Sequence, residues 1–143
     1  MIASTISPWI VTLDALEPYR CKSKKQENLL PYLQLNTNKN TYNIKLNTYL
    51  ETENGDLNLL SNSNYKNLYW SMAQQLAHQT VNGCNVRAGD LFGSGTISGK
   101  DEKSFGSMLE LCWNEEKPIS LKDGTKRTYL KDGDNIIIRG YCE

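Results

Sequence analysis

The sequence has very little histidine, no closely spaced cysteine pair and no long hydrophobic run. It contains a single histidine, and its four cysteines form no Cys-x-x-Cys pair, so the close ligand pairs of a zinc site are missing. No run of about 18 apolar residues is present, which argues against a membrane-spanning helix. The start also lacks the basic and apolar regions of a secretory signal. These absences favour a cytoplasmic protein with free thiols and no membrane partner.

The charge is balanced. Lysine plus arginine and aspartate plus glutamate each number 16, which gives a net charge of zero. Such a chain offers no broad basic field for nucleic acid and no acidic tail. Lys22, Lys24 and Lys25 form a small basic cluster, but Glu27 lies beside it, as is typical of a solvated loop. The 143 residues are the size of one domain with a single core.

Most of the predicted elements are short strands. Residues 41–50 alternate polar and apolar side chains, which predicts a half-buried strand. Asn54-Gly55-Asp56 is a hairpin signal, so a strand over residues 57–60 should return antiparallel to the first. Further strands are expected at residues 9–11, 90–97, 107–113, 119–120, 127–130 and 134–140. Short strands separated by Gly-Asp turns predict a β-rich roll or sandwich.

One main helix is expected over about residues 64–82. Ser63 or Asn64 could cap its first amides, and Gly83 is placed for a left-handed cap at its end. The predicted fold class is therefore β-rich α+β, a mixed β-roll or sandwich of short strands with this one amphipathic helix. A single helical turn at residues 14–18 should stop at its proline. The buried stripe of the main helix is expected to comprise Tyr65, Leu68, Tyr69, Met72, Ala73, Leu76 and Thr80, and the three tryptophans (Trp9, Trp70 and Trp113) are expected in the core.

The most informative segment is residues 88–111. A run rich in Gly, Ser and Thr (residues 93–99) is followed by a small-residue turn that leads into Leu109-Glu110-Leu111. Glycines allow a backbone to approach a ligand closely, and Thr96 places a hydroxyl among them. Glu110 is expected at the mouth of an apolar strand, where a partly desolvated carboxylate needs a partner. Thr96 and Glu110 are the candidate site residues, with a turn hydroxyl and a salt-bridged strand glutamate as the structural alternatives.

Three other conspicuous features favour structural roles. His78 lies off the predicted helix stripe without neighbours at ligand spacing, which favours a surface or packing histidine. Ser98 lacks the Gly-x-Ser-x-Gly frame of a nucleophilic serine. Asp132-Gly133-Asp134 lacks the further oxygen ligands of a calcium loop, which favours a turn.

Several blocks, taken in order, resemble the fumarylacetoacetase (fumarylacetoacetate hydrolase) family, and nearly cover the chain. No single block identifies the family, but all of them together, in the family's order along the chain, carry the resemblance. They are Ser7-Pro8-Trp9-Ile10-Val11, Leu30-Pro31-Tyr32-Leu33, Tyr69 to Leu76, Val81-Asn82-Gly83-Cys84-Asn85, Gly95-Thr96-Ile97-Ser98-Gly99, Ser104 to Leu111, and Asp132-Gly133-Asp134 leading into Ile136 to Cys142.

The resemblance implies an enzyme that hydrolyses the carbon–carbon bond of 4-fumarylacetoacetate, the last step of tyrosine and phenylalanine catabolism. It implies a small diketo acid as substrate, a divalent cation (Ca²⁺ or Mg²⁺) as cofactor, and a homodimer. Glu110 matches the family's glutamate that orients the catalytic histidine, and Thr96 matches its substrate-contacting threonine. The matching Ser-Phe-Gly-Ser-Met-Leu-Glu block favours fumarylacetoacetase activity over other diketo-acid hydrolases, decarboxylases and isomerases on the same scaffold.

The chain also departs from the family pattern. The family's metal-binding carboxylates, its histidine base and most substrate-gripping residues lie upstream of the Ser7 block, and Ala3 stands where the family has a glycine. We therefore expect residues 1–143 to be the C-terminal part of the hydrolase domain, truncated at both ends, with no metal ligands and no activity alone. The alternative is a non-catalytic fragment or interaction module that retains part of the fold.

Overall fold

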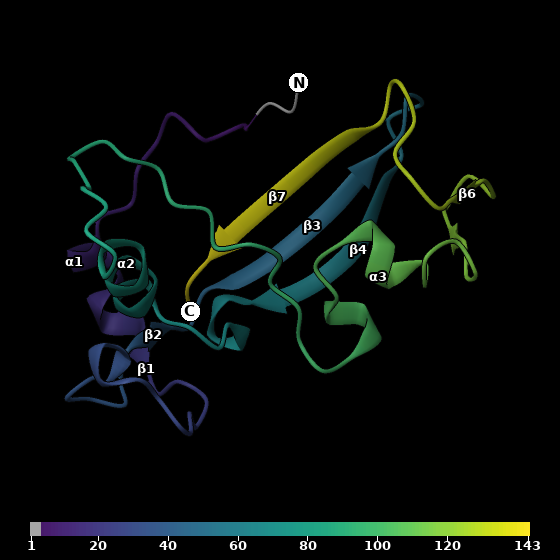
Figure 1. Cartoon of the computed structure of the whole chain (residues 1–143). Coiled ribbons are helices and arrows are strands. Elements are labelled where there is room, and N and C mark those ends of the chain that lie inside the picture. Colours follow the sequence, from purple (N-terminus) through teal and green to yellow (C-terminus); the bar gives the residue numbers. More distant parts are fainter. Residues whose placement is uncertain (1–3) are drawn as a thin grey trace.

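The computed structural model describes residues 4–143, so Ala3 and its match to a family glycine lie outside the described residues. The central feature is an antiparallel sheet of three strands in the order β4-β3-β7 (Figure 1). In chain order the elements are α1 (Leu13–Leu16), the 3-10 turn η1 (Glu17–Tyr19), β1 (Arg20–Cys21), η2 (Pro31–Leu33), β2 (Thr41–Tyr42), β3 (Lys45–Glu51), β4 (Leu57–Asn64), η3 (Tyr65–Asn67), α2 (Met72–Thr80), η4 (Glu102–Ser104), α3 (Met108–Leu111), β5 (Ile119–Ser120), β6 (Lys126–Arg127) and β7 (Asn135–Tyr141).

The predicted hairpin is confirmed and forms the centre of the sheet. β3 and β4 pair antiparallel, and Gly55 in the connecting turn has φ +83°, a value that favours glycine. The Thr52 N–H donates to the Asp56 carbonyl at 3.1 Å and closes the turn. β7 pairs with the other edge of β3, so the last strand of the chain completes the sheet.

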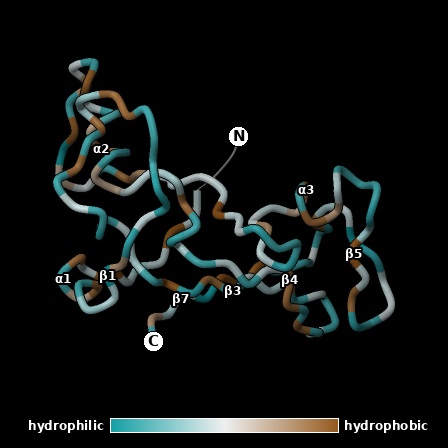
Figure 2. The backbone as a smooth tube through the Cα atoms, turned by 90° about the horizontal axis from the view of Figure 1, so that it is seen from below, coloured by the Kyte–Doolittle hydropathy of each residue, from teal (hydrophilic) through white to brown (hydrophobic). Residues whose placement is uncertain are grey.

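The predicted fold class is confirmed. The described residues form seven short strands, which lie in one three-stranded sheet and two two-stranded sheets, and few helices. The α1–α2 region and the α3–β5 region lie at opposite ends of the central sheet in both views (Figures 1 and 2). Within residues 4–143, no helix has the length and apolarity needed to cross a bilayer.

The main helix is shorter than predicted. α2 begins at Met72, and the residues before it form the 3-10 turn η3 and an irregular link. Ser71 and Gln74 set this start through a capping box, in which the Ser71 N–H donates to Gln74 Oε1 at 3.0 Å and the Gln74 N–H donates to Ser71 Oγ at 3.3 Å. Gly83, with φ +86°, follows the helix as expected.

The predicted buried stripe of this helix is wrong. Leu76 is 46% exposed, whereas the buried residue of α2 is Gln74, at 1%. The Gln74 side chain donates to the Leu33 carbonyl at 2.9 Å and exchanges hydrogen bonds with Gln26. These hydrogen bonds of the buried Gln74 side chain therefore hold α2 against Leu33 and Gln26. Figure 2 shows short hydrophobic stretches in many places along the described residues.

Three predicted strands are also wrong. Residues 9–11 and 90–97 have no strand structure, and Trp9 is 86% exposed. Residues 107–113 contain the helix α3, because Ser107 caps a helical turn. None of the three tryptophans is buried, and Trp113 instead packs beneath the Lys117 ammonium, 3.6 Å from the ring centre.

A buried ion pair ties β6 to the turn before β7. The Arg127 guanidinium donates from Nε to Asp134 Oδ2 at 2.9 Å and from Nη2 to Oδ1 at 3.1 Å. Their side chains are only 9% and 2% exposed. The hydrogen bond to Arg127 is the main reason that the pKa of Asp134 lies below its ordinary value. Asp132-Gly133-Asp134 is thus a turn, as predicted, and its last carboxylate is engaged by Arg127.

We expect Asp134→Asn to lower the thermal midpoint of the chain at pH 7 by several degrees, because it leaves a buried guanidinium without its charge partner. Asp132→Asn, at an exposed position of the same turn, should change it little. A carboxyl whose native pKa is lowered stabilises the fold above its unfolded pKa of about 3.9, and this contribution is lost as the pH falls through the native value. The thermal midpoints of Asp134→Asn and of the unsubstituted chain should therefore converge as the pH drops below about 4. A difference between the two midpoints that stays constant at all pH values would contradict this role of Asp134.

Candidate functional site

The segment that carries Thr96 is anchored to the sheet. The Ser63 hydroxyl on β4 donates to the Ile97 carbonyl at 2.8 Å. Two residues further on, the Gly99 N–H donates to the Ser104 carbonyl at 2.9 Å, which closes a loop over η4. Although residues 91–99 have no regular structure, these bonds hold Ile97 against β4 and Gly99 against η4.

Gly106 brings the two candidate segments into contact. A Cβ atom at Gly106 would lie 2.7 Å from the Ile97 carbonyl oxygen and 2.8 Å from Thr96 Cγ2. Only a residue without a side chain allows this approach. The Gly106 N–H also donates to Ser98 Oγ at 3.0 Å. The structure therefore places Thr96 next to the turn that leads into Glu110, as a shared site requires.

Glu110 lies on α3 and not on a strand, which corrects the prediction. Its carboxylate accepts from Ser98 Oγ, at 2.9 Å to Oε1 and 2.7 Å to Oε2, and from Ser107 Oγ, at 3.0 Å to Oε2. Ser107 also caps the helix by accepting from the Glu110 N–H at 3.3 Å. The half-buried carboxylate thus has the partners that its setting demands, and they are hydroxyls. Within residues 4–143 no ion pair involves Glu110, so the salt-bridge alternative is not what is found.

The two candidate side chains retain free capacity. A carboxylate has about four acceptor positions, and the two serines leave room for one more donor, such as an imidazole N–H. The exposed Thr96 side chain faces Gly106 with its methyl group, and its hydroxyl bonds to none of the residues 4–143. The arrangement can therefore hold a carboxylate rigidly on one segment while the neighbouring segment offers a hydroxyl to a ligand.

His78 does not belong to this site. Its Nδ1 lies 3.0 Å from the Tyr32 hydroxyl, and the two rings stack at 6.1 Å between centroids. It lies on α2, at the other end of the sheet from α3 (Figures 1 and 2). The prediction of a surface or packing histidine is confirmed.

No cation site is formed by the part of the chain that the structure describes. Residues 4–143 contain no group of three or more His, Cys, Asp or Glu side chains that could hold a metal ion. The carboxylate of the candidate site, Glu110, accepts instead from two serine hydroxyls. These residues therefore do not fit the divalent cation that the resemblance implies.

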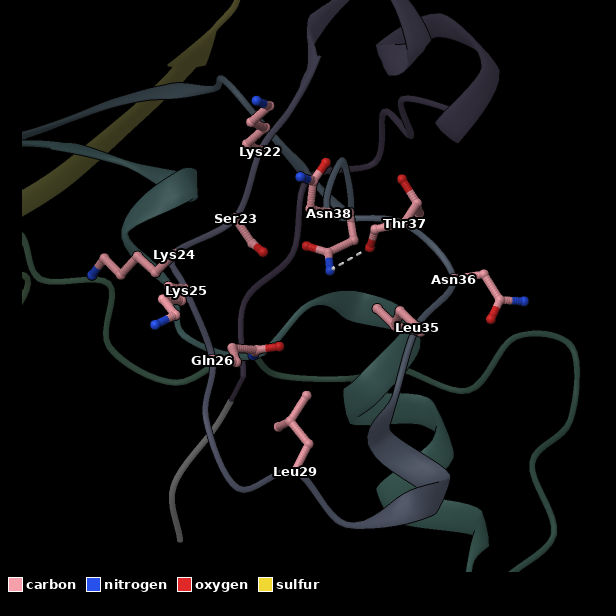
Figure 3. Close-up of a pocket in the computed structure, with 11 residues that line it drawn as sticks. Lys22, Ser23, Lys24, Lys25, Gln26, Leu29, Leu35, Asn36, Thr37 and Asn38 are labelled. Atoms are coloured by element: carbon pink, nitrogen blue, oxygen red, sulfur yellow. Dashed lines mark hydrogen bonds between the residues drawn. The ribbon is translucent and has the colours of Figure 1, made fainter.

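The lysine cluster borders a polar cavity of about 670 Å³, shown in Figure 3. Lys25 pairs with the exposed Glu27 at 2.9 Å, and Lys24 donates to the Asn67 carbonyl. In Figure 3 the side chains of Lys22 and Lys24 point away from the hollow. The cluster is therefore a solvated loop, as predicted.

Sequence reasoning missed three residues of the site: Ser98, Gly106 and Ser107. Ser107 and Glu110 have the Ser-x-x-Glu spacing of a helix N-terminus, which could have placed Glu110 on a helix. The bond from Ser98 to Glu110 has no signature in the sequence, because the two residues lie on different segments.

Comparison with known proteins defines the class to which this fold and site belong. Residues 2–140 match the family described as "Fumarylacetoacetate (FAA) hydrolase C-terminal". Because the match covers nearly the whole chain, the chain belongs to the fumarylacetoacetate hydrolase family.

The relatives within that family carry a more specific name. The chain is 52% identical over 142 residues to Fumarylacetoacetase from Arabidopsis thaliana, covering 98% of this chain and 33% of that protein. It is 48% identical over 142 residues to Fumarylacetoacetase from Homo sapiens, covering 98% of this chain and 34% of that protein. The chain thus spans about a third of the length of these relatives.

Proposed function

We propose that this chain supplies part of the active site of a fumarylacetoacetase, which hydrolyses 4-fumarylacetoacetate to fumarate and acetoacetate in tyrosine and phenylalanine catabolism. The relatives' name supports this reaction. The observation that carries it is the Glu110 carboxylate, held by two serine hydroxyls at the end of the turn whose Gly106 contacts Thr96. Free thiols at all four cysteines support the cytoplasmic location included in the proposal.

In this proposal Glu110 acts through a histidine contributed by the rest of the enzyme. That histidine removes a proton from water, the resulting hydroxide adds to a substrate carbonyl, and the neighbouring carbon–carbon bond breaks. The released carbon takes up a proton, which yields one carboxylic acid and one ketone-bearing acid. Glu110 would accept the second imidazole N–H, fix its tautomer and stabilise the imidazolium. A Ca²⁺ or Mg²⁺ ion would have to be held by groups outside residues 4–143.

The proposal can be tested in a chimera in which residues 1–143 replace the matching third of the Arabidopsis thaliana relative. This keeps the remaining two thirds of an enzyme named Fumarylacetoacetase. Substrate loss is followed by absorbance. A folded chimera that turns over other diketo acids but not fumarylacetoacetate would contradict the proposed substrate and favour another reaction on the same scaffold.

Thr96 is proposed to donate its hydroxyl to a carboxylate or keto oxygen of the substrate. Thr96→Val keeps the volume and removes the donor, a loss typically worth about 0.5–1.5 kcal/mol, or about 1.5–3 kcal/mol with a charged partner. We expect kcat/KM of the chimera to fall on the order of tenfold to a hundredfold, with metal affinity unchanged. Thr96→Ser, which keeps the hydroxyl, should retain most activity. If the Val variant loses stability or metal binding, Thr96 supports the turn and not the substrate.

The exposed apolar side chains of Trp9 and Ile10 support the proposal that the complete enzyme is a homodimer. They are 86% and 88% exposed on a segment without a strand partner, as expected of a surface that contacts more protein. In the complete enzyme, which we propose to be a homodimer, this surface would be covered. The same observation favours the alternative function, a non-catalytic interaction module, which a fully active chimera would refute.

A further inference from the structure

Ser98 connects the two candidate segments through a hydrogen bond with a fixed direction. Its Oγ accepts from the Gly106 N–H at 3.0 Å, and a backbone amide can only donate. The single proton of the Ser98 hydroxyl is therefore free to point at Glu110, whose two oxygens lie 2.9 and 2.7 Å away. A hydroxyl that donates to a carboxylate makes a charge-assisted bond, which is stronger than a neutral one.

Ser98 contributes something that Ser107 does not. Each serine oxygen accepts from a backbone amide, but Ser107 contacts only Oε2 of Glu110, at 3.0 Å. Ser98 alone contacts Oε1 as well. Among the described residues, Ser98 is therefore the one hydroxyl within hydrogen-bond distance of both carboxylate oxygens, and together with Ser107 it restricts rotation of the carboxylate about its last bond.

The position of Ser98 is itself imposed by the sheet. The carbonyl of the preceding residue, Ile97, accepts from Ser63 on β4 at 2.8 Å. The close approach at Gly106 fixes the other side of the segment. A chain of short contacts thus runs from β4 through Ser98 to the carboxylate on α3.

We propose that Ser98 is a positioning residue that orients the Glu110 carboxylate toward the imidazole of the complete enzyme. This inference rests on the proposed function, because it requires Glu110 to act on a histidine. The hydroxyl would touch neither substrate nor the reacting atoms. Its loss should therefore affect the transition state more than substrate binding, and lower kcat with KM unchanged.

The test compares variants of the chimera. We expect Ser98→Ala to lower kcat about tenfold with KM unchanged, since one of two donors to a charged group is removed. Ser98→Thr, which keeps the hydroxyl, should recover most of the loss. Ser94→Ala is the matched control on the same segment, because the Ser94 hydroxyl only donates to the adjacent Gly95 carbonyl, at 3.0 Å. If Ser98→Ala does not fold, Ser98→Cys gives the same comparison with a weaker donor and a smaller loss.

The double variant separates this inference from the proposed function. In a Glu110→Gln background, Ser98→Ala should cause no further loss of kcat, because the two residues act as one unit. An equal loss in both backgrounds, or a rise in KM alone, would overturn the positioning role. A large effect of Glu110→Gln with no effect of Ser98→Ala would overturn it while leaving the proposed function in place. No effect of Glu110→Gln would overturn both.

Discussion

Replacing Glu110 with glutamine in the chimera is expected to lower kcat by about 10²–10⁴-fold, the range that general-base assistance contributes. Glutamine nearly preserves the shape of the side chain and can still accept from Ser98 and Ser107 through its carbonyl oxygen. A neutral glutamine cannot stabilise the positive charge of an imidazolium. Its terminal nitrogen is a hydrogen-bond donor, so only its oxygen can accept. Because that charge develops in the transition state, KM should change much less than kcat.

The control for this variant is Glu116→Gln. Glu116 is an exposed carboxylate beyond α3, outside the serine network, and its loss should leave kcat unchanged. Circular dichroism and the thermal midpoint check that Glu110→Gln remains folded. A folded variant with unchanged kcat would return Glu110 to a structural role as part of the cap of α3.

The second large effect is expected from Gly106→Ala. The added Cβ would lie 2.7 Å from the Ile97 carbonyl oxygen, so backbone must move for it to fit. Such overpacking typically costs about 1–3 kcal/mol, and a misplacement of about 1 Å in a site can cost on the order of 10²-fold in rate. We therefore expect kcat/KM of the chimera to fall on the order of a hundredfold, since the shift separates Thr96 and Ser98 from Glu110.

Gly93→Ala provides the comparison for this substitution. It lies on the same segment as Thr96, and a Cβ there would meet no atom within 4 Å. Hydrogen exchange at the Gly106 amide, which donates to Ser98, reports directly on the contact. If Gly106→Ala retained full activity and slow exchange at this amide, the close approach at Gly106 would not be needed to place Thr96 and Ser98 relative to Glu110.

The sequence predicted the sheet better than the helices, for local reasons. The β3–β4 hairpin depends on a glycine turn and on the alternation of polar and apolar residues, both of which are signals between near neighbours in sequence. The structure confirms this hairpin. α2 starts at the capping box of Ser71 and Gln74, and its orientation depends on bonds from the buried Gln74 side chain to Gln26 and Leu33, far away in sequence. Hydrophobic periodicity carries no trace of such polar contacts, so the predicted stripe extended too far and faced the wrong way.

The candidate site was predicted in part. The grouping of Thr96 and Glu110 followed from their residue types and from the family resemblance, and the structure brings their segments together at Gly106. The partners of the carboxylate could not be predicted, because Ser98 reaches Glu110 across a loop whose path depends on Ser63 of β4. Their catalytic roles stay predictions that the chimera variants address.

The most direct measurement is the steady-state hydrolysis of fumarylacetoacetate by the chimera, followed by absorbance beside the Arabidopsis thaliana parent and the isolated 143-residue chain. We expect turnover by the chimera comparable to that of its parent, and a loss of about 10²–10⁴-fold in kcat for Glu110→Gln. We expect none by the isolated chain, whose described residues bring no histidine to Glu110 and form no metal site. A folded chimera without turnover, or multiple turnovers by the isolated chain, would contradict these expectations.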